Sequence, residues 1–177
     1  MPGRTQQSGF TLIEILVVLI IVGLLASLAV FTFGGSSQQR ELENEVRDLY
    51  LLMQTASEQA VFNNRELGLQ IFPEGYQFVA YEDESGDWAA SGERLFRSRS
   101  FPDWLEVTKF IESDAPRLAS AEDELRPDVV FFSSGETTPF EFEFTIRRVD
   151  SDYLQVLASD GVSPLEWRKP GDDEDDQ

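Results

Sequence analysis

The longest apolar stretch of the chain extends from Phe10 to Phe33 and contains one ionisable side chain, Glu14, and no proline. As an α-helix rising about 1.5 Å per residue, the part from Ile15 to Phe33 covers about 30 Å, the thickness of a bilayer's hydrocarbon core. We therefore expect residues 10–33 to form a transmembrane helix, with Glu14 near its N-terminal end.

A second apolar pattern follows Gly34-Gly35-Ser36-Ser37, four residues that weaken a helix and favour a kink. Apolar residues then recur every three or four positions, which predicts an amphipathic helix with one narrow stripe against a globular domain. The stripe comprises Leu42, Val46, Leu49, Met53, Ala56 and Ala60. We expect residues 34–64 to continue the first helix and to end it at Asn63-Asn64, because asparagine tolerates the left-handed conformation of a helix end.

Beyond the helix, apolar residues alternate with polar ones, which is the period of a half-buried β-strand. Leu67–Ile71 and Tyr76–Tyr81 flank a Pro/Gly turn and predict a β-hairpin. Val129–Phe132 and Phe140–Ile146 predict a second hairpin through residues 133–139. Further strands are expected at Leu95-Phe96, Leu105–Ile111 and Tyr153–Leu157, with a last short one ending near Trp167.

The polar stretches between these strands are expected to be loops. They are Glu82–Glu93 and Ser113–Pro127, the second with a helical turn around Leu118–Leu125. The predicted fold class is α+β, with a long N-terminal helix packed on antiparallel β-sheets and a β-rich globular domain over residues 65–169. The acidic residues 170–177 are expected to form a disordered tail.

The composition excludes several classes of function. The chain has 14 Lys+Arg against 33 Asp+Glu, a net charge of −19, which repels phosphate backbones, so we expect no nucleic-acid partner. It has no cysteine, which excludes disulfides and thiolate metal sites. It also has no histidine, the commonest catalytic base and transition-metal ligand. We expect neither a cofactor nor enzymatic activity.

Three weaker candidate sites remain. Asp83 to Asp87 surround a glycine with carboxylates, like a fragment of a calcium loop, but lack the remaining ligand positions, so we interpret the stretch as a solvated loop. Ser133-Ser134-Gly135-Glu136 is interpreted as a turn, since no nucleophile elbow surrounds it. Trp88, Trp104 and Trp167 form either core packing or an exposed partner-binding patch.

The N-terminal motif supplies a resemblance. Ser8-Gly9-Phe10-Thr11-Leu12-Ile13-Glu14 resembles the class III signal of type IV pilins and of the pseudopilins of type II secretion. The resemblance implies that residues 1–9 are a leader peptide. A prepilin peptidase would cut between Gly9 and Phe10 and methylate the new N-terminal Phe10. Glu14 would then be the carboxylate used in assembly.

A second resemblance concerns the globular domain. Phe131–Phe142 and Glu58–Arg65 are similar to segments of the GspH-type minor pseudopilins. This implies a structural subunit near the tip of the pseudopilus, which helps to drive folded exoproteins across the outer membrane. Its partners would be other pseudopilins through the N-terminal helix, the peptidase, the inner membrane, and exoproteins or the secretin. Arg4, with no further Lys or Arg before Arg40, predicts a cytoplasmic N-terminus and a periplasmic C-terminal domain.

A physical reason for Glu14 follows from the proposed cut. A chain that begins at Phe10 carries a cation among packed apolar helices, and Glu14 of the same or a neighbouring subunit supplies the anion. Burying one partner alone typically costs about 3–5 kcal/mol, so the pair would set the register of assembly. Two alternatives stay open. One is a minor type IV pilin, and the other is a single-pass anchored sensor or periplasmic enzyme with an uncut Met1.

Overall fold

The computed structural model describes residues 12–112, 118, 125–147 and 153–170. The chain divides into two compact units, Met1–Gln38 and Gln39–Gln177. One helix, α1 (Leu12–Asn63), has residues in both units. No helix within the described residues is long and apolar enough to qualify as a membrane span. The segment limits 1–9, 10–33 and 34–64 stay predictions, and the leader, the acidic tail and most of Ser113–Pro127 lie outside the described residues.

The second half of α1 forms the amphipathic helix that the spacing predicts. All six residues of the predicted stripe are at most 1% exposed, and Leu52 joins them at 6%. The helix ends where expected, because Asn64 adopts a left-handed conformation with φ 48°. The Asn64 N–H donates to Val61 O (3.4 Å) and the Arg65 N–H to Ala60 O (3.1 Å), the pair of bonds of a Schellman motif.

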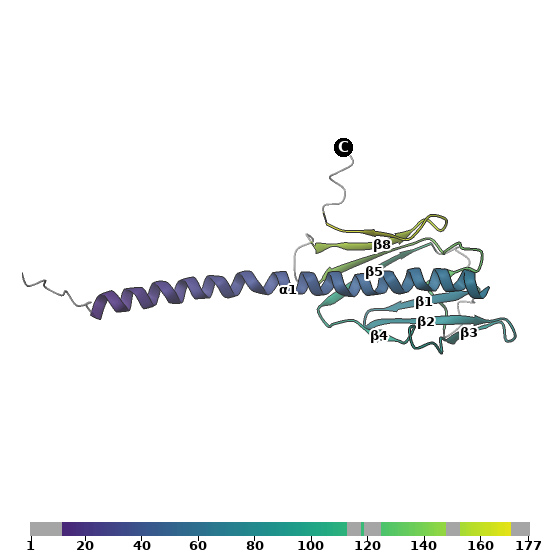
Figure 1. Ribbon diagram of the computed structural model, residues 1–177, viewed down its shortest axis with the longest axis horizontal. Helices are drawn as coiled ribbons and strands as arrows, with labels where there is room; N and C mark the ends of the chain where they lie inside the picture. The colour runs from purple at the N-terminus through teal and green to yellow at the C-terminus, as the bar shows by residue number, and fades with distance from the viewer. Residues whose placement is uncertain (1–11, 113–117, 119–124, 148–152, 171–177) are drawn as a thin grey trace, which may run out of the picture. The chain divides into compact units, whose positions relative to one another are not determined.

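Nine strands form two antiparallel sheets in the described part of the second unit, and the second half of α1 packs on them (Figure 1). The five-stranded sheet has the order β3-β2-β1-β6, with β4 also paired to β2. The four-stranded sheet has the order β5-β7-β8-β9. The strands are β1 (Leu67–Phe72), β2 (Gly75–Glu82), β3 (Asp87–Ala90), β4 (Arg99–Ser100), β5 (Leu105–Ile111), β6 (Val129–Phe131), β7 (Phe140–Ile146), β8 (Gln155–Ser159) and β9 (Glu166–Arg168). The predicted α+β fold class is confirmed.

The first hairpin is confirmed as β1 and β2, but the chain after it was predicted less well. The expected loop Glu82–Glu93 contains β3, whose Trp88 ring contacts Tyr81 at 5.4 Å between centroids. The expected strand Leu95-Phe96 is wrong, since these residues form a turn. Phe96 is nevertheless 1% exposed and stacks 4.9 Å from Phe78, so its burial does not need a strand.

The expected hairpin between Val129–Phe132 and Phe140–Ile146 is wrong in its pairing. β6 pairs with β1, whereas β7 pairs with β5 and β8 in the other sheet. The chain does reverse after β6, because Thr138 N–H donates to Val130 O at 2.9 Å. Pro139 follows at once and has no N–H to continue this pairing, so the chain passes to the second sheet.

The main core lies between α1 and the inner faces of both sheets. The alternation of β7 is confirmed, with Phe140, Phe142, Phe144 and Ile146 all buried. The predicted Leu105–Ile111 strand is confirmed as β5. The strand predicted at Tyr153–Leu157 corresponds to β8, which begins and ends two residues later. The predicted last strand near Trp167 is β9. A smaller cluster of Val79, Trp88 and Val130 packs separately from the main core.

Candidate functional site: an apolar helix and an anchored globular unit

The predicted assembly residue Glu14 lies in the first turn of α1, within the first unit. The large apolar side chains from Leu12 to Leu25 are all exposed in the single chain, from 47% at Val17 to 85% at Leu12. A continuous apolar surface of this kind marks a site covered by lipid or by other protein. Gly9 and Phe10, the residues expected to flank the cleavage, lie outside the described residues. The roles of all three residues therefore stay predictions.

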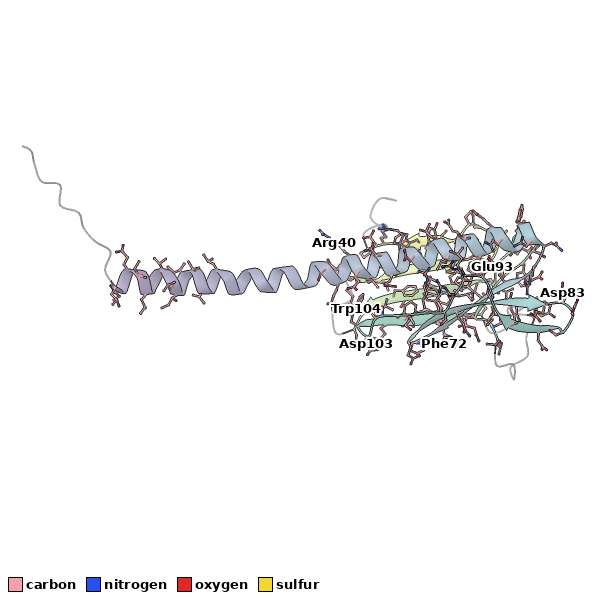
Figure 2. All side chains as sticks on the ribbon, turned by 60° about the horizontal axis from the view of Figure 1, so that its bottom comes forward. Arg40, Phe72, Asp83, Glu93, Asp103 and Trp104 are labelled. Carbon is pink, nitrogen blue, oxygen red and sulfur yellow. The ribbon has the colours of Figure 1, made fainter. Side chains whose placement is uncertain are left out.

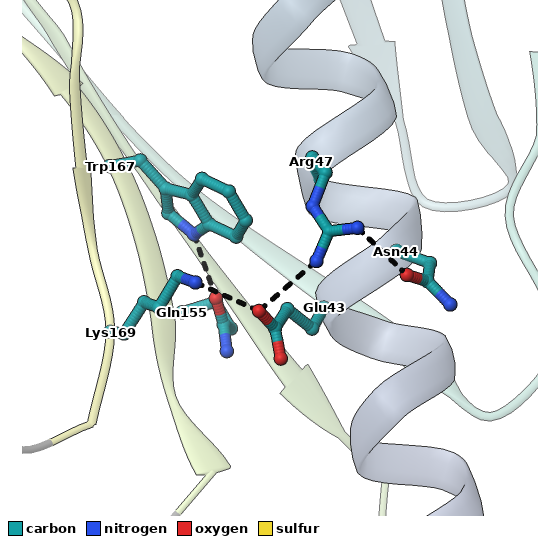
Figure 3. Close-up of polar contacts among 6 residues, drawn as sticks. All are labelled: Glu43, Asn44, Arg47, Gln155, Trp167 and Lys169. Atoms are coloured by element: carbon teal, nitrogen blue, oxygen red, sulfur yellow. Dashed lines mark hydrogen bonds and ion pairs between the residues drawn. The ribbon is translucent and has the colours of Figure 1, made fainter.

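The globular unit holds its last strand against α1 through a group of six side chains (Figure 3). Glu43 Oε1 accepts from Lys169 Nζ at 2.8 Å and from Arg47 at 3.2 Å. Arg47 also donates to Asn44 Oδ1 at 3.3 Å. The hydrogen bond and charge of Lys169, followed by those of Arg47, lower the pKa of Glu43 below its ordinary value of 4.5.

The indole of Trp167 is the apolar part of this attachment. Its Nε1 donates to Gln155 Oε1 at 2.7 Å, and Lys169 Nζ lies 4.2 Å from the ring centroid. The ring lies 5.7 Å from that of Tyr50, whose hydroxyl donates to Leu165 O at 3.3 Å. These contacts join β9 to α1, although the two elements lie more than a hundred residues apart in the sequence. The sequence analysis missed this group, because no local pattern pairs Glu43 with Lys169.

The structure places the three weaker candidates in ordinary structural roles. Asp83 projects at the β2–β3 turn (Figure 2), where Gly86 N–H donates to Glu82 O at 2.8 Å. Among the described residues, no group of three carboxylates lies close enough to hold a metal ion. Ser133 lies in a turn, as expected, and its hydroxyl donates to Glu66 Oε1 at 2.8 Å.

The open question about the tryptophans is resolved in favour of packing. Trp88 is 7% exposed, and its Nε1 donates to Leu118 O at 3.2 Å. Trp104 and Trp167 are half-buried and pack against the main core. None of the three contributes to an exposed aromatic patch in the described part of the chain.

These features define a class of protein. A long N-terminal helix, apolar and exposed in its first part and amphipathic in its second, packs its second part on antiparallel sheets, as in pilin-like proteins. Residues 4–30 match the prokaryotic N-terminal methylation motif. Residues 45–161 match the family described as type II transport protein GspH. The chain belongs to the GspH family.

Individual relatives agree with this assignment. The chain is 30% identical to the type II secretion system protein H of Aeromonas hydrophila, over 97% of this chain and 99% of the relative. It is 33% identical to the protein of the same name from Pseudomonas aeruginosa, over 86% of this chain and 91% of the relative. The solved structure of the minor pseudopilin EpsH from the type 2 secretion system of Vibrio cholerae matches with a TM-score of 0.63. The match covers 75% of this chain and 99% of the EpsH chain, at 16% sequence identity.

Proposed function

We propose that the chain is a minor pseudopilin of type II secretion, a non-catalytic subunit of the pseudopilus that lies near its tip. The exposed apolar surface of α1 with Glu14 in its first turn carries the proposal. Membership in the GspH family and the N-terminal methylation motif support it. In this role the subunit helps to drive folded exoproteins across the outer membrane.

The proposal includes processing of the N-terminus. A prepilin peptidase cuts between Gly9 and Phe10 and methylates Phe10, and the match of residues 4–30 to the methylation motif supports this step. The freed amino group then meets the Glu14 carboxylate of the same or a neighbouring subunit. Since an unpaired buried charge is costly, the pair selects the register in which helices pack.

The proposed location follows from the same segment. Before assembly, residues 10–33 anchor the subunit in the bacterial inner membrane, with the C-terminal domain in the periplasm. In the fibre, α1 packs against the helices of other pseudopilins, because both lipid and sister helices cover an apolar surface. Contacts with exoproteins or the secretin would then involve the globular unit.

The test combines processing with assembly. Mass spectrometry of the native protein is expected to show an N-terminus at methylated Phe10, and Met1 at the N-terminus of a functional protein would contradict the proposal. Glu14→Ala is expected to abolish incorporation into the fibre, measured by crosslinking to other pseudopilins. Glu58→Ala, which removes an exposed carboxylate from the same helix in the second unit, is the matched control and should leave crosslinking unchanged.

A further inference from the structure

The turn between β8 and β9 contains Asp160-Gly161, the one Asp-Gly pair in the sequence (Figure 1). An aspartate before glycine is prone to isomerisation of the main chain, because glycine has no side chain to keep its nitrogen away from the carboxyl group. The functions considered above make no use of this turn. Whether the pair reacts in the folded chain depends on how the turn holds the two reacting groups.

The isomerisation needs only the chain and water. Gly161 N attacks Asp160 Cγ, a C–N bond forms, and the amide proton and the carboxyl hydroxyl leave together as water. The product is a five-membered succinimide ring. Water then opens the ring at either carbonyl: one opening restores aspartate, and the other gives isoaspartate, in which the main chain runs through Cγ. Because the hydroxyl must leave, the carboxyl group reacts in its protonated form, and ionisation slows the reaction.

The turn stabilises the ionised form of the Asp160 carboxyl group. Asp160 Oδ1 accepts from the Ser163 N–H at 2.7 Å and from the Val162 N–H at 2.9 Å. Asp160 Oδ2 accepts from the Ser163 hydroxyl at 2.8 Å. These hydrogen bonds, led by the one from the Ser163 N–H, lower the pKa of Asp160 below its ordinary value of 3.8. The protonated carboxyl group is therefore rarer in the folded turn than in a free chain.

A second set of contacts restrains the attacking nitrogen. The Gly161 N–H donates to Oγ of the buried Ser159 at 3.1 Å, and Gly161 O accepts from the Thr137 N–H at 2.8 Å. Gly161 is itself buried, and a Cβ on it would lie 2.9 Å from Thr137 O and 3.1 Å from Pro139 Cγ. Ring closure rotates the peptide unit between Asp160 and Gly161, which would break both hydrogen bonds in this tightly packed place.

We propose that Asp160-Gly161 is a site of spontaneous isoaspartate formation, which the folded turn restrains and which local opening of the β8–β9 turn releases. Segments of a native chain open at free energies below that of global unfolding, and exposed turns open more readily than core strands. The isomerised main chain is longer by a methylene group, so Gly161 can no longer meet Thr137 as before. Modification would thus loosen this turn from the segment that leads into β7. The inference concerns the globular unit and holds whether or not the N-terminus is processed.

The test compares the folded chain with a peptide that lacks the fold. The full-length chain in detergent and a synthetic peptide of residues 157–166 are incubated side by side at neutral pH. Isoaspartate at position 160 is quantified by peptide mapping with electron-transfer fragmentation, which distinguishes it from aspartate. The peptide should isomerise at least about tenfold faster than the folded chain, because the folded turn must open first. Equal rates would overturn the restraint, and absence of isoaspartate from the peptide would overturn the site.

Variants identify the contacts that restrain the reaction. Ser163→Ala removes one hydrogen bond to the carboxylate and should speed isomerisation of the folded chain about fivefold, while Ser163→Thr, which keeps a hydroxyl, should restore the slow rate. Ser85→Ala is the matched control, since the Ser85 hydroxyl donates to Glu82 O in the β2–β3 turn. Asp160→Glu should abolish the signal, because closure of the larger ring is much slower. An unchanged rate in Ser163→Ala, no rescue by Ser163→Thr, or equal acceleration by Ser85→Ala would each contradict the inference.

Discussion

At the residue scale, Gly75 is the glycine of the described residues at which an added methyl group meets the nearest atom. A Cβ at this residue would lie 2.1 Å from the backbone oxygen of Arg99, at the point where β2 pairs with Ser100 of β4. Backbone cannot move aside as a flexible side chain can. Gly75→Ala is therefore expected to destabilise the fold by about 1–3 kcal/mol, measured by denaturant unfolding. Gly92→Ala, whose Cβ meets nothing within 4 Å, is the control, and equal losses would contradict the argument.

A substitution of Glu45 is expected to stabilise the fold instead, because the surroundings of this side chain disfavour its charged form. Burial, and then the charges of Asp48 and Glu41, raise the pKa of Glu45 above its ordinary value of 4.5. Because the pKa is raised in the folded state, the stability that Glu45 contributes is present below pH 4.5. It is lost as the pH rises through the folded-state pKa. Glu45→Gln should thus raise the free energy of unfolding at pH 7, by less than about 1 kcal/mol. The gain should vanish at pH 3, and a gain that persists there would refute the electrostatic cause.

At the scale of elements, the attachment of β9 to α1 depends on Trp167 and the Glu43–Lys169 pair. Trp167→Ala removes a half-buried ring and is expected to cost about 2 kcal/mol, less than the loss of a fully buried tryptophan. Hydrogen exchange at residues 166–168 should rise more than at β7. Trp167→Phe keeps the ring and should recover most of the protection. Uniformly faster exchange across both sheets would show that β9 does not open separately.

Removing the Glu43–Lys169 ion pair of the same attachment is expected to lower the stability of the fold at neutral pH. The lowered pKa of Glu43 means that its contribution is present above pH 4.5 and is lost as the pH falls through the folded-state value. Glu43→Gln should lower the free energy of unfolding at pH 7 by less than about 1 kcal/mol, because the pair is partly solvated. As the pH falls through the folded-state pKa of Glu43, the difference between the two proteins should shrink toward zero, and chemical denaturation at pH 7 and at successively lower pH values measures it.

The elements themselves show which features could be predicted from the sequence. The helical stripe, the first hairpin and the alternation of β7 each follow from a local period, and all three are confirmed. The separation of β6 from β7 could not be predicted. After the chain reverses, Thr138 makes two hydrogen bonds to Val130, but Pro139 has no N–H to continue the pairing. Lys109 is a similar case, because its Nζ crosses from β5 to bond Ile71 O at 2.9 Å. Contacts between distant elements leave no period in the sequence.

At the scale of the whole molecule, the net charge of −19 is a source of internal repulsion. Salt screens such repulsion, so raising sodium chloride from about 0.05 to 0.5 M should raise the thermal midpoint by a few degrees.

Calcium offers a sharper comparison, because the Asp83–Asp87 turn is closed by its own backbone bond, and carboxylates of the described residues do not gather into a metal site. At equal ionic strength, calcium and magnesium chloride should therefore stabilise the chain equally. A rise of the midpoint with calcium alone, lost in Asp83→Asn but kept in Glu74→Gln, would establish a calcium site at this turn and make charge screening an incomplete account.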